Sequence, residues 1–257
     1  MKKSSLYFWP SQALFLGSVQ DNAEHRHYAV QLSFALDKPF EIVHADKYEL
    51  FQAVAIASNS PHQMEGKNGR QVILLLDPEE KITRRIAALY LTREPIKGIE
   101  VKFFADDLVR LRNSLDQGVS CLEVGGLINE IFAKLLGEYC LVPPVDPRIE
   151  KAVTLIEQLP VKKISLSLIA AEVHLSEGRF IHLFKEQIGI PVRRYLLWRR
   201  LLMAVKAVVR GSSFTTAAYE TGFADSAHLS RTFKAMFGLS PSEVFKDSRF
   251  VQAVACR

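Results

Sequence analysis

The spacing of hydrophobic and polar positions changes about 100 residues into the chain. Before that point, apolar and polar side chains alternate over residues 28–36, and a continuous apolar run covers 72–76. Both patterns are typical of β-strands. Turn-forming residues separate such segments at 37–39, 59–61 and 66–69. We therefore predict a small β-barrel over about residues 5–100, with a short helix at 81–90.

Two amphipathic helices are predicted over about residues 105–139, where apolar side chains recur every three or four positions. Their apolar faces fit two interpretations that can both hold: packing on the barrel, or contact with a second copy of the chain. In the second interpretation, the dimer contacts are formed by Leu127, Ile131 and Leu135. Residues 140–147 are predicted to form a linker, because three prolines in eight residues exclude a helix.

One pattern occurs twice in the rest of the chain, as copy one (residues 169–190) and copy two (217–239). The copies are offset by 48 residues before a turn and by 49 after it. Each predicts a short helix, a tight turn and a second helix, the arrangement of a helix-turn-helix unit. The apolar stripes of the second helices are Phe180 with Phe184, and Leu229 with Phe233.

Turn and cap residues fit this arrangement. Gly222 stands where the second turn needs a positive φ, and His174 stands at the same place in the first. Ser176 and Asp225 are suitable N-caps for the second helices. A long helix at about 192–210 joins the copies and would span roughly 28 Å at about 1.5 Å per residue.

The exposed early positions of the second helices carry short polar and cationic groups. A solvated face explains any one of them, but not two faces in matching register. Arginine forms hydrogen bonds with guanine, and serine does so with several bases, whereas lysine is suited to contacts with phosphates. The positions are Glu177, Gly178, Arg179, Ile181 and His182 in copy one, and Ser226, Ala227, His228, Ser230 and Arg231 in copy two. The phosphate candidates are Lys185, Lys234, Arg193 and Arg194.

The distribution of charge and the cysteine content indicate the kind of partner and the cellular compartment of the protein. From Arg148 onward there are 17 Lys and Arg against 9 Asp and Glu, whereas the rest of the chain has 16 against 19. A basic half that coincides with the repeat favours a nucleic-acid partner. The three cysteines have no Cys-x-x-Cys spacing and predict neither a disulfide framework nor a zinc finger, so a reducing cytoplasm is expected. No apolar run is long enough to cross a membrane.

Residues 146–245 resemble the DNA-binding domain of the AraC family of bacterial transcription regulators. The strongest segment is 218–241, AYETGFADSAHLSRTFKAMFGLSP. The resemblance implies seven helices, two helix-turn-helix units and contact with adjacent major grooves on one face of a promoter. By position, the resemblance implies that Gly178, Arg179 and His182 read bases in copy one. In copy two it implies the same role for Ser226, Ala227, His228, Ser230 and Arg231.

Copy one departs from the family pattern in two places. Gly178 has no side chain and weakens its helix by up to ~1 kcal/mol. Ile190 stands where a Ser or Thr usually caps the joining helix, and loss of that cap costs about 1 kcal/mol.

The first 100 residues resemble a cupin sensor barrel loosely, through His25-Arg26-His27, Gln31 and Pro61-His62. Three converging histidines would hold a divalent metal. However, Gln31 stands where the usual carboxylate would be, so we predict surface or rim histidines and no metal. Metal binding by His25, His27 and His62 stays as the alternative.

The predicted fold class is α+β, with a cupin-like barrel and two helices followed by an all-α domain of two helix-turn-helix units joined by a long helix. The predicted parts are a sensor or dimerisation domain at 1–139, a linker at 140–147, a DNA-binding domain at 148–247 and a tail at 248–257.

The predicted function is sequence-specific regulation of transcription, without enzymatic activity or cofactor. The expected partners are promoter DNA, RNA polymerase, a second copy of the chain and a small effector in the barrel, as the resemblance implies, with no membrane. Two alternatives remain open: a cupin-type metalloenzyme with a DNA-binding domain, and an architectural DNA binder without an effector.

Overall fold

The computed structural model describes residues 4–18, 21–117, 120–137, 142–161, 164–245 and 251–256. Contacts divide the chain into two units. The first unit comprises Met1–Val142 and Phe233–Arg257, and the second comprises Pro143–Thr232. Residues 140 and 141 of the predicted linker lie outside the described residues.

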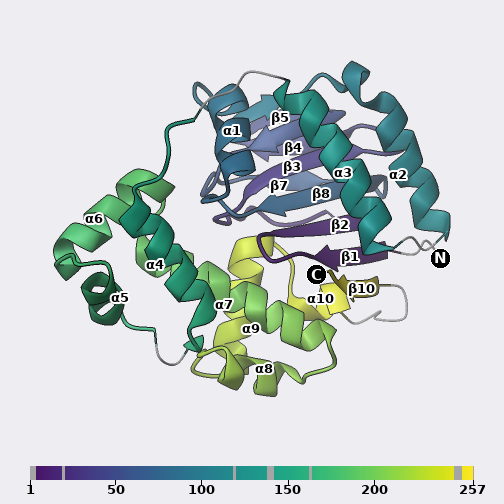
Figure 1. Cartoon of the computed structure of the whole chain (residues 1–257). Helices are drawn as coiled ribbons and strands as arrows, with labels where there is room; N and C mark the ends of the chain where they lie inside the picture. Colours follow the sequence, from purple (N-terminus) through teal and green to yellow (C-terminus); the bar gives the residue numbers. More distant parts are fainter. Residues whose placement is uncertain are drawn as a thin grey trace. The chain divides into compact units, whose positions relative to one another are not determined.

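The first unit contains two β-sheets (Figure 1). In spatial order, the seven-stranded sheet comprises β10 (Val251–Ala255), β1 (Ser4–Phe8), β2 (Gln12–Ser18), β8 (Arg70–Leu76), β3 (Val30–Ala35), β6 (Ala53–Ile56) and β9 (Ile96–Gly98). The three-stranded sheet comprises β5 (Lys47–Phe51), β4 (Phe40–His44) and β7 (Gln63–Glu65). The predicted barrel is therefore built from two sheets, and the α+β class is confirmed.

Alternation along the strands produces two apolar clusters. Leu14 and Leu16 on β2 face a cluster that also contains residues of the helices, whereas Phe15 faces a cluster shared with β4 and β7. The helices of this unit are α1 (Lys81–Tyr90), η1 (Val101–Phe103), α2 (Ala105–Gln117) and α3 (Cys121–Leu136). The helix predicted at 81–90 and the pair predicted after 105 are confirmed.

The apolar face of α3 packs inside its own chain. Leu127, Ile131 and Leu135 are buried in the cluster that contains β2, β3 and β8. The assignment of these three side chains to a dimer contact is therefore corrected, because a partner could reach them only by unpacking this core.

Two of the predicted turns contain residues with positive φ values, a conformation that asparagine tolerates. Asn59, Lys67 and Asn68 have positive φ values of 59°, 49° and 56°. Asparagine tolerates this region better than most residues. These turns let β6, β7 and β8 follow one another within short segments of chain.

The end of the chain returns to its beginning. β10 pairs in parallel with β1, from Ser4 opposite Val251 to Phe8 opposite Ala255. This pairing brings Cys256 to Cys121 at the start of α3, and a disulfide joins the two across 135 residues of sequence. Nothing in the sequence indicated this disulfide, because spacing along the chain does not reveal which strands become neighbours.

Replacement of Cys121 by serine is expected to lower the free energy of unfolding by about 2–4 kcal/mol, because the disulfide restricts the unfolded chain. Urea unfolding with and without reductant measures the effect, which should disappear when the wild-type bond is reduced. The matched control is Cys140→Ser, which leaves the bond intact. Three reactive thiols in the oxidised, unfolded wild type, instead of one, would show that the bond does not form.

The repeated region is helical, as predicted. Its helices are α4 (Pro147–Gln158), α5 (Leu166–Glu172), α6 (Glu177–Ile188), α7 (Val192–Val209), α8 (Phe214–Glu220), α9 (Ser226–Phe237) and α10 (Pro241–Phe245). The last residues of α9 and all of α10 belong to the first unit by their contacts. Among the described residues, every helix is too short or too polar to span a bilayer.

Candidate nucleic-acid interface

The two copies have matching turns. In copy one the Leu175 amide donates to the Ala170 carbonyl, and in copy two the Phe223 amide donates to the Ala218 carbonyl, each at 2.9 Å. His174 has a φ of 56° and Gly222 a φ of 77°, so the predicted left-handed residue is present in both turns. The repeat in the sequence therefore corresponds to a repeat in hydrogen bonding.

Caps fix where each second helix begins. The Ser176 hydroxyl accepts from the Arg179 amide at 3.3 Å, and the Asp225 carboxylate accepts from the His228 amide at 2.6 Å. Both predicted N-caps are confirmed. Each cap lies immediately before the positions expected to face DNA, so it places those positions in the first turns of the helix.

Packing fixes which face of each second helix remains accessible. The predicted stripes of Phe180 with Phe184 and of Leu229 with Phe233 are buried. The small residues Ala170 and Ala218 are buried in the first helices, at matching positions of the two copies. Burial of one face leaves the other face of α6 and α9 available to a ligand.

The predicted base-reading residues lie on that available face. Gly178, Arg179, His182, Ala227 and Arg231 are exposed, whereas Ser226, His228 and Ser230 are half-buried. The His228 ring lies edge-on to Phe223, with their centroids 5.2 Å apart, so it also supports the turn of copy two.

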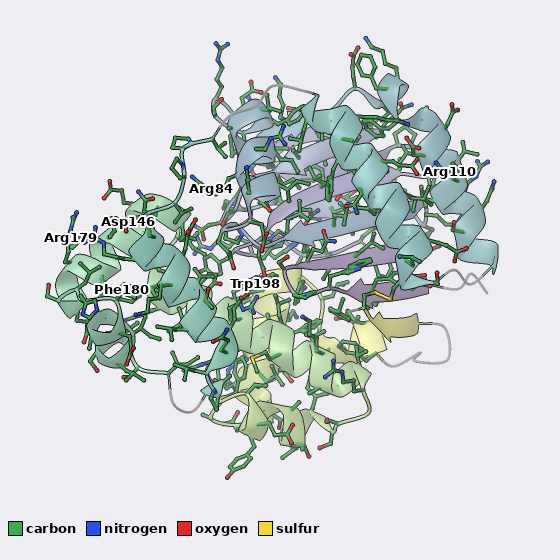
Figure 2. All side chains as sticks on the ribbon, viewed as in Figure 1. Arg84, Arg110, Asp146, Arg179, Phe180 and Trp198 are labelled. Carbon is green, nitrogen blue, oxygen red and sulfur yellow. A yellow bond between two sulfur atoms is a disulfide. The ribbon has the colours of Figure 1, made fainter. Side chains whose placement is uncertain are left out.

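Arg179 lies beside an acidic cap. Figure 2 shows Arg179 and Asp146 near one another, at α6 and at the start of α4. Asp146 caps α4 and binds Arg148, and the Arg148 guanidinium holds the pKa of Asp146 at about 2, with a smaller contribution from Arg179. The cap is therefore ionised at neutral pH and contributes negative charge next to a cation that we expect to face DNA.

The cations assigned to phosphates are accessible. Lys185, Lys234, Arg193 and Arg194 are all exposed. Arg199, further along the joining helix, forms an ion pair with Glu157 of α4 at 3.2 Å. Arg199 therefore fixes α7 against α4 in the second unit, a role that its sequence position does not reveal.

The joining helix α7 has 18 residues, which corresponds to about 27 Å at ~1.5 Å per residue. Tyr195 and Trp198 are fully buried on it, and the Tyr195 ring lies 5.2 Å from that of Phe184 in α6. Its N-cap is Pro191, which makes no side-chain cap bond, and Ile190 is buried. The missing cap was correctly expected but assigned one residue too early.

Three histidines of the first unit contradict our expectation of surface or rim positions. His25, His27 and His62 are only 7%, 2% and 0% exposed and form one cluster. Burial lowers the pKa of His25 to about 4, and it also lowers the pKa values of His27 and His62. The sequence singled out these residues, but their convergence was kept only as the alternative to surface positions.

Comparison with known proteins identifies the repeated region. Residues 169–247 match a family model described as a helix-turn-helix domain. The Arabinose operon regulatory protein of Escherichia coli (strain K12) is 35% identical over 108 residues, which are 40% of this chain and 36% of that protein. Residues 169–247 are therefore an AraC-type helix-turn-helix domain, and the proteins that this region resembles are AraC-family transcription regulators.

The similarity to AraC-family proteins extends beyond the repeat. "Probable transcriptional regulator LumQ" of Photobacterium leiognathi is 26% identical over 198 residues, or 73% of this chain and 76% of that protein. ToxT from Vibrio cholerae O395 superposes with a TM-score of 0.59 at 12% identity, over 93% of this chain and 98% of that chain. At this identity the ToxT match shows the fold alone, over 93% of this chain.

Gly178→Ala is expected to raise the free energy of unfolding by up to ~1 kcal/mol, because alanine loses less backbone freedom than glycine in a helix. An added Cβ would meet no atom within 4 Å, so no clash opposes the gain. Thermal unfolding measures it. A destabilised Gly178→Ala protein would contradict the placement of this residue on an open helical face.

Proposed function

We propose that this chain is an AraC-type regulator that binds two successive major grooves on one face of a promoter, with α6 in one groove and α9 in the other. The observation that carries the proposal is the matched construction of the two copies, in hydrogen bonding, caps and buried stripes. Two reading helices need centres about 34 Å apart, and a rigid helix such as α7 suits a spacing of this order.

Each accessible side chain has a chemical role in this proposal. Arg179 and Arg231 would donate hydrogen bonds to the edges of guanine bases. The serines of α9 would form hydrogen bonds with donors or acceptors on several bases. Lys185, Lys234, Arg193 and Arg194 would contact phosphates and supply affinity that depends on salt rather than on sequence. His182 and His228 complete the reading faces, while Gly178 and Ala227 permit close approach.

The first unit would regulate this binding. One solved form of ToxT, similar in fold to this chain, is described as bound to an unsaturated fatty acid. This supports a small apolar or amphipathic effector for the first unit. The protein partners that the function predicts are a second copy of the chain and RNA polymerase. We propose the cytoplasm as the location because promoter DNA is there, and no longer because of the cysteines, two of which form a disulfide. We infer that the chain acts by binding and not by catalysis.

Hydroxyl-radical footprinting of the full chain on a duplex selected for tight binding tests the proposal. We expect two protected patches on the same face of the duplex, displaced by about one helical turn. Protection of a single patch, or of sites on opposite faces, would contradict it. Affinity should also fall steeply with salt, on selected and on random duplexes alike.

A further inference from the structure

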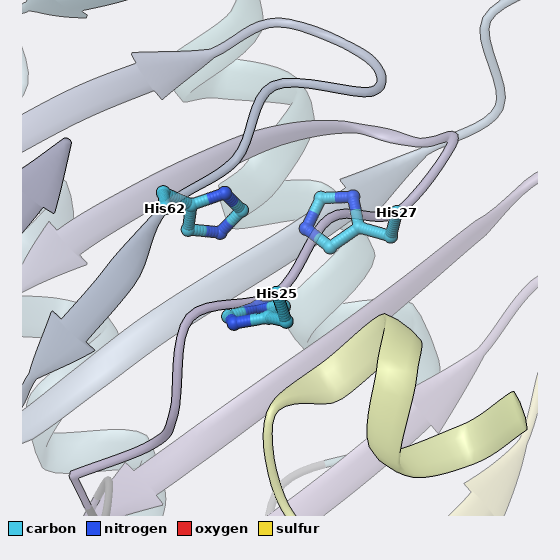
Figure 3. A group of neighbouring side chains, drawn as sticks. All are labelled: His25, His27 and His62. Carbon is cyan, nitrogen blue, oxygen red and sulfur yellow. The ribbon is translucent and has the colours of Figure 1, made fainter. Parts of the chain in front are cut away.

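The backbone of the first unit brings three histidine side chains together. His25 and His62 lie opposite each other and exchange two amide-to-carbonyl bonds of 2.9 Å, so their side chains project to the same side. His27 follows two residues later and joins them (Figure 3). The ring centroids are 4.3 Å apart for His25 and His62, 5.2 Å for His27 and His62, and 5.8 Å for His25 and His27.

Backbone carbonyls decide which ring nitrogens carry protons. The Nδ1 atoms of His25, His27 and His62 lie 3.0, 3.1 and 2.9 Å from the carbonyl oxygens of Ala23, Ala29 and Ser60. A carbonyl only accepts, so each Nδ1 donates, and the neutral rings of His25 and His62 carry their lone pairs on Nε2. Such a bond from the far nitrogen is also what orients a histidine that binds a metal.

One of the three rings has an unsatisfied nitrogen among the described residues. Within the described part of the chain, Nε2 of His62 is buried and makes no hydrogen bond. Leaving a buried acceptor unsatisfied costs about 1–3 kcal/mol. Nε2 of His27 lies 2.8 Å from Oε1 of Gln31, and Nε2 of Gln31 donates to the Ser33 hydroxyl at 2.9 Å. Because an amide oxygen only accepts, Gln31 has to turn away before Nε2 of His27 binds a metal. A cation among the rings would satisfy the lone pair of His62.

The spacing suits a metal ion after small ring rotations. One nitrogen from each of the three histidines lies within 4.8 Å of those of the other two. Nitrogens bound tetrahedrally to Zn²⁺ at ~2.0–2.1 Å are about 3.3 Å apart. We propose that His25, His27 and His62 form a binding site for a divalent transition-metal ion that prefers imidazole, such as Zn²⁺, Co²⁺ or Ni²⁺.

The donor set decides the class of metal. The cluster offers three imidazoles and no carboxylate, a set that suits transition metals and not Mg²⁺ or Ca²⁺, which require oxygen ligands. Three histidines leave at least one coordination position open. Gln31, already in contact with His27, is the neighbouring side chain that could supply an oxygen to it.

A residue from the far end of the sequence holds the His25 segment in place. The Ala23 amide donates to the Gly238 carbonyl at 3.1 Å, and the Ala23 carbonyl accepts from His25. Gly238 has a φ of 70°, and a Cβ there would lie 2.3 Å from the Ala23 oxygen and 2.9 Å from Nδ1 of His25. The ligand segment is therefore fixed by the glycine that follows α9, within the first unit.

The test uses the full chain, purified with chelator and then dialysed. Titration with Co²⁺ should give one equivalent of bound metal and the visible absorption of a nitrogen-ligated site, without a thiolate charge-transfer band. Zn²⁺ should displace it and raise the melting temperature as its concentration rises, whereas Mg²⁺ should not. His62→Asn should weaken Co²⁺ binding by more than about 100-fold.

The control is His182→Ala, an exposed histidine of the second unit, which should bind Co²⁺ like the wild type. His25→Asn is a second ligand variant, used if His62→Asn does not fold by circular dichroism. The proposal is overturned if the folded wild type binds neither Co²⁺, Zn²⁺ nor Ni²⁺ stoichiometrically. It is also overturned if the folded ligand variants bind as tightly as the wild type.

Discussion

Arg231→Ala is expected to weaken binding to the selected duplex by about 1–3 kcal/mol, or roughly 5- to 150-fold, and to relax the preference for one base. Arg231 is exposed on α9, on the face opposite the buried Leu229 and Phe233. A bidentate pair with guanine is the contact that the substitution would remove. Fluorescence anisotropy with selected and random duplexes measures both effects.

Comparison of Lys234→Ala with Arg231→Ala distinguishes a contact with phosphate from a contact with a base. Lys234 is also exposed on α9, one turn further along. Its loss should weaken both duplexes to a similar degree and reduce the slope of log affinity against log salt by about 1. Equal losses on both duplexes for Arg231→Ala would mean that this arginine touches only the backbone of DNA.

Phe184→Ala is expected to lower the free energy of unfolding of the second unit by about 3–5 kcal/mol. Phe184 is fully buried, with its ring 5.8 Å from Phe180 and 5.2 Å from Tyr195. It therefore connects the reading helix of copy one with the joining helix. Thermal unfolding should shift downward by more than about 10 °C for a unit of this size.

The same substitution should also affect DNA binding. If α6 loses its anchor on α7, the footprint of copy one should fade while that of copy two persists. Leu168→Ala is the matched control, because Leu168 lies on α5 of the same copy but is 40% exposed, so its loss should change stability by less than about 0.5 kcal/mol. A Phe184→Ala protein as stable as this control would contradict the packing described.

The repeated unit was predictable because local rules determine it. Gly222 and His174 mark turns, Ser176 and Asp225 mark caps, and the apolar stripes follow the helical period. None of these signals depends on distant parts of the chain. The cap of α7 was placed one residue early because its position came from the family resemblance, and neither Ile190 nor Pro191 has a capping side chain that would mark it.

The features that were missed depend on pairing between distant segments. β10 lies beside β1, which creates the bond between Cys121 and Cys256, and no spacing rule predicts that neighbour. The burial of the histidines likewise follows from the bridge between His25 and His62, 37 positions apart in sequence. The alternation in His25-Arg26-His27 did hold a usable signal, since residues two apart in an extended chain share a side.

The face of α3 was ambiguous for another physical reason. An apolar helical stripe shows that something covers it, but not whether the cover comes from the same chain. Leu127, Ile131 and Leu135 are covered by the barrel. A dimer, if it uses α3, must therefore use other residues.

Two reading helices, joined by α7, are proposed to bind one face of a double helix. Selection of bound sequences from random duplexes, using the full chain, is the decisive experiment. We expect a two-part site with centres about 10–10.5 base pairs apart, and loss of binding when five base pairs are inserted between the parts. A single short box, bound equally well whatever flanks it, would show that α6 and α9 do not read one site together.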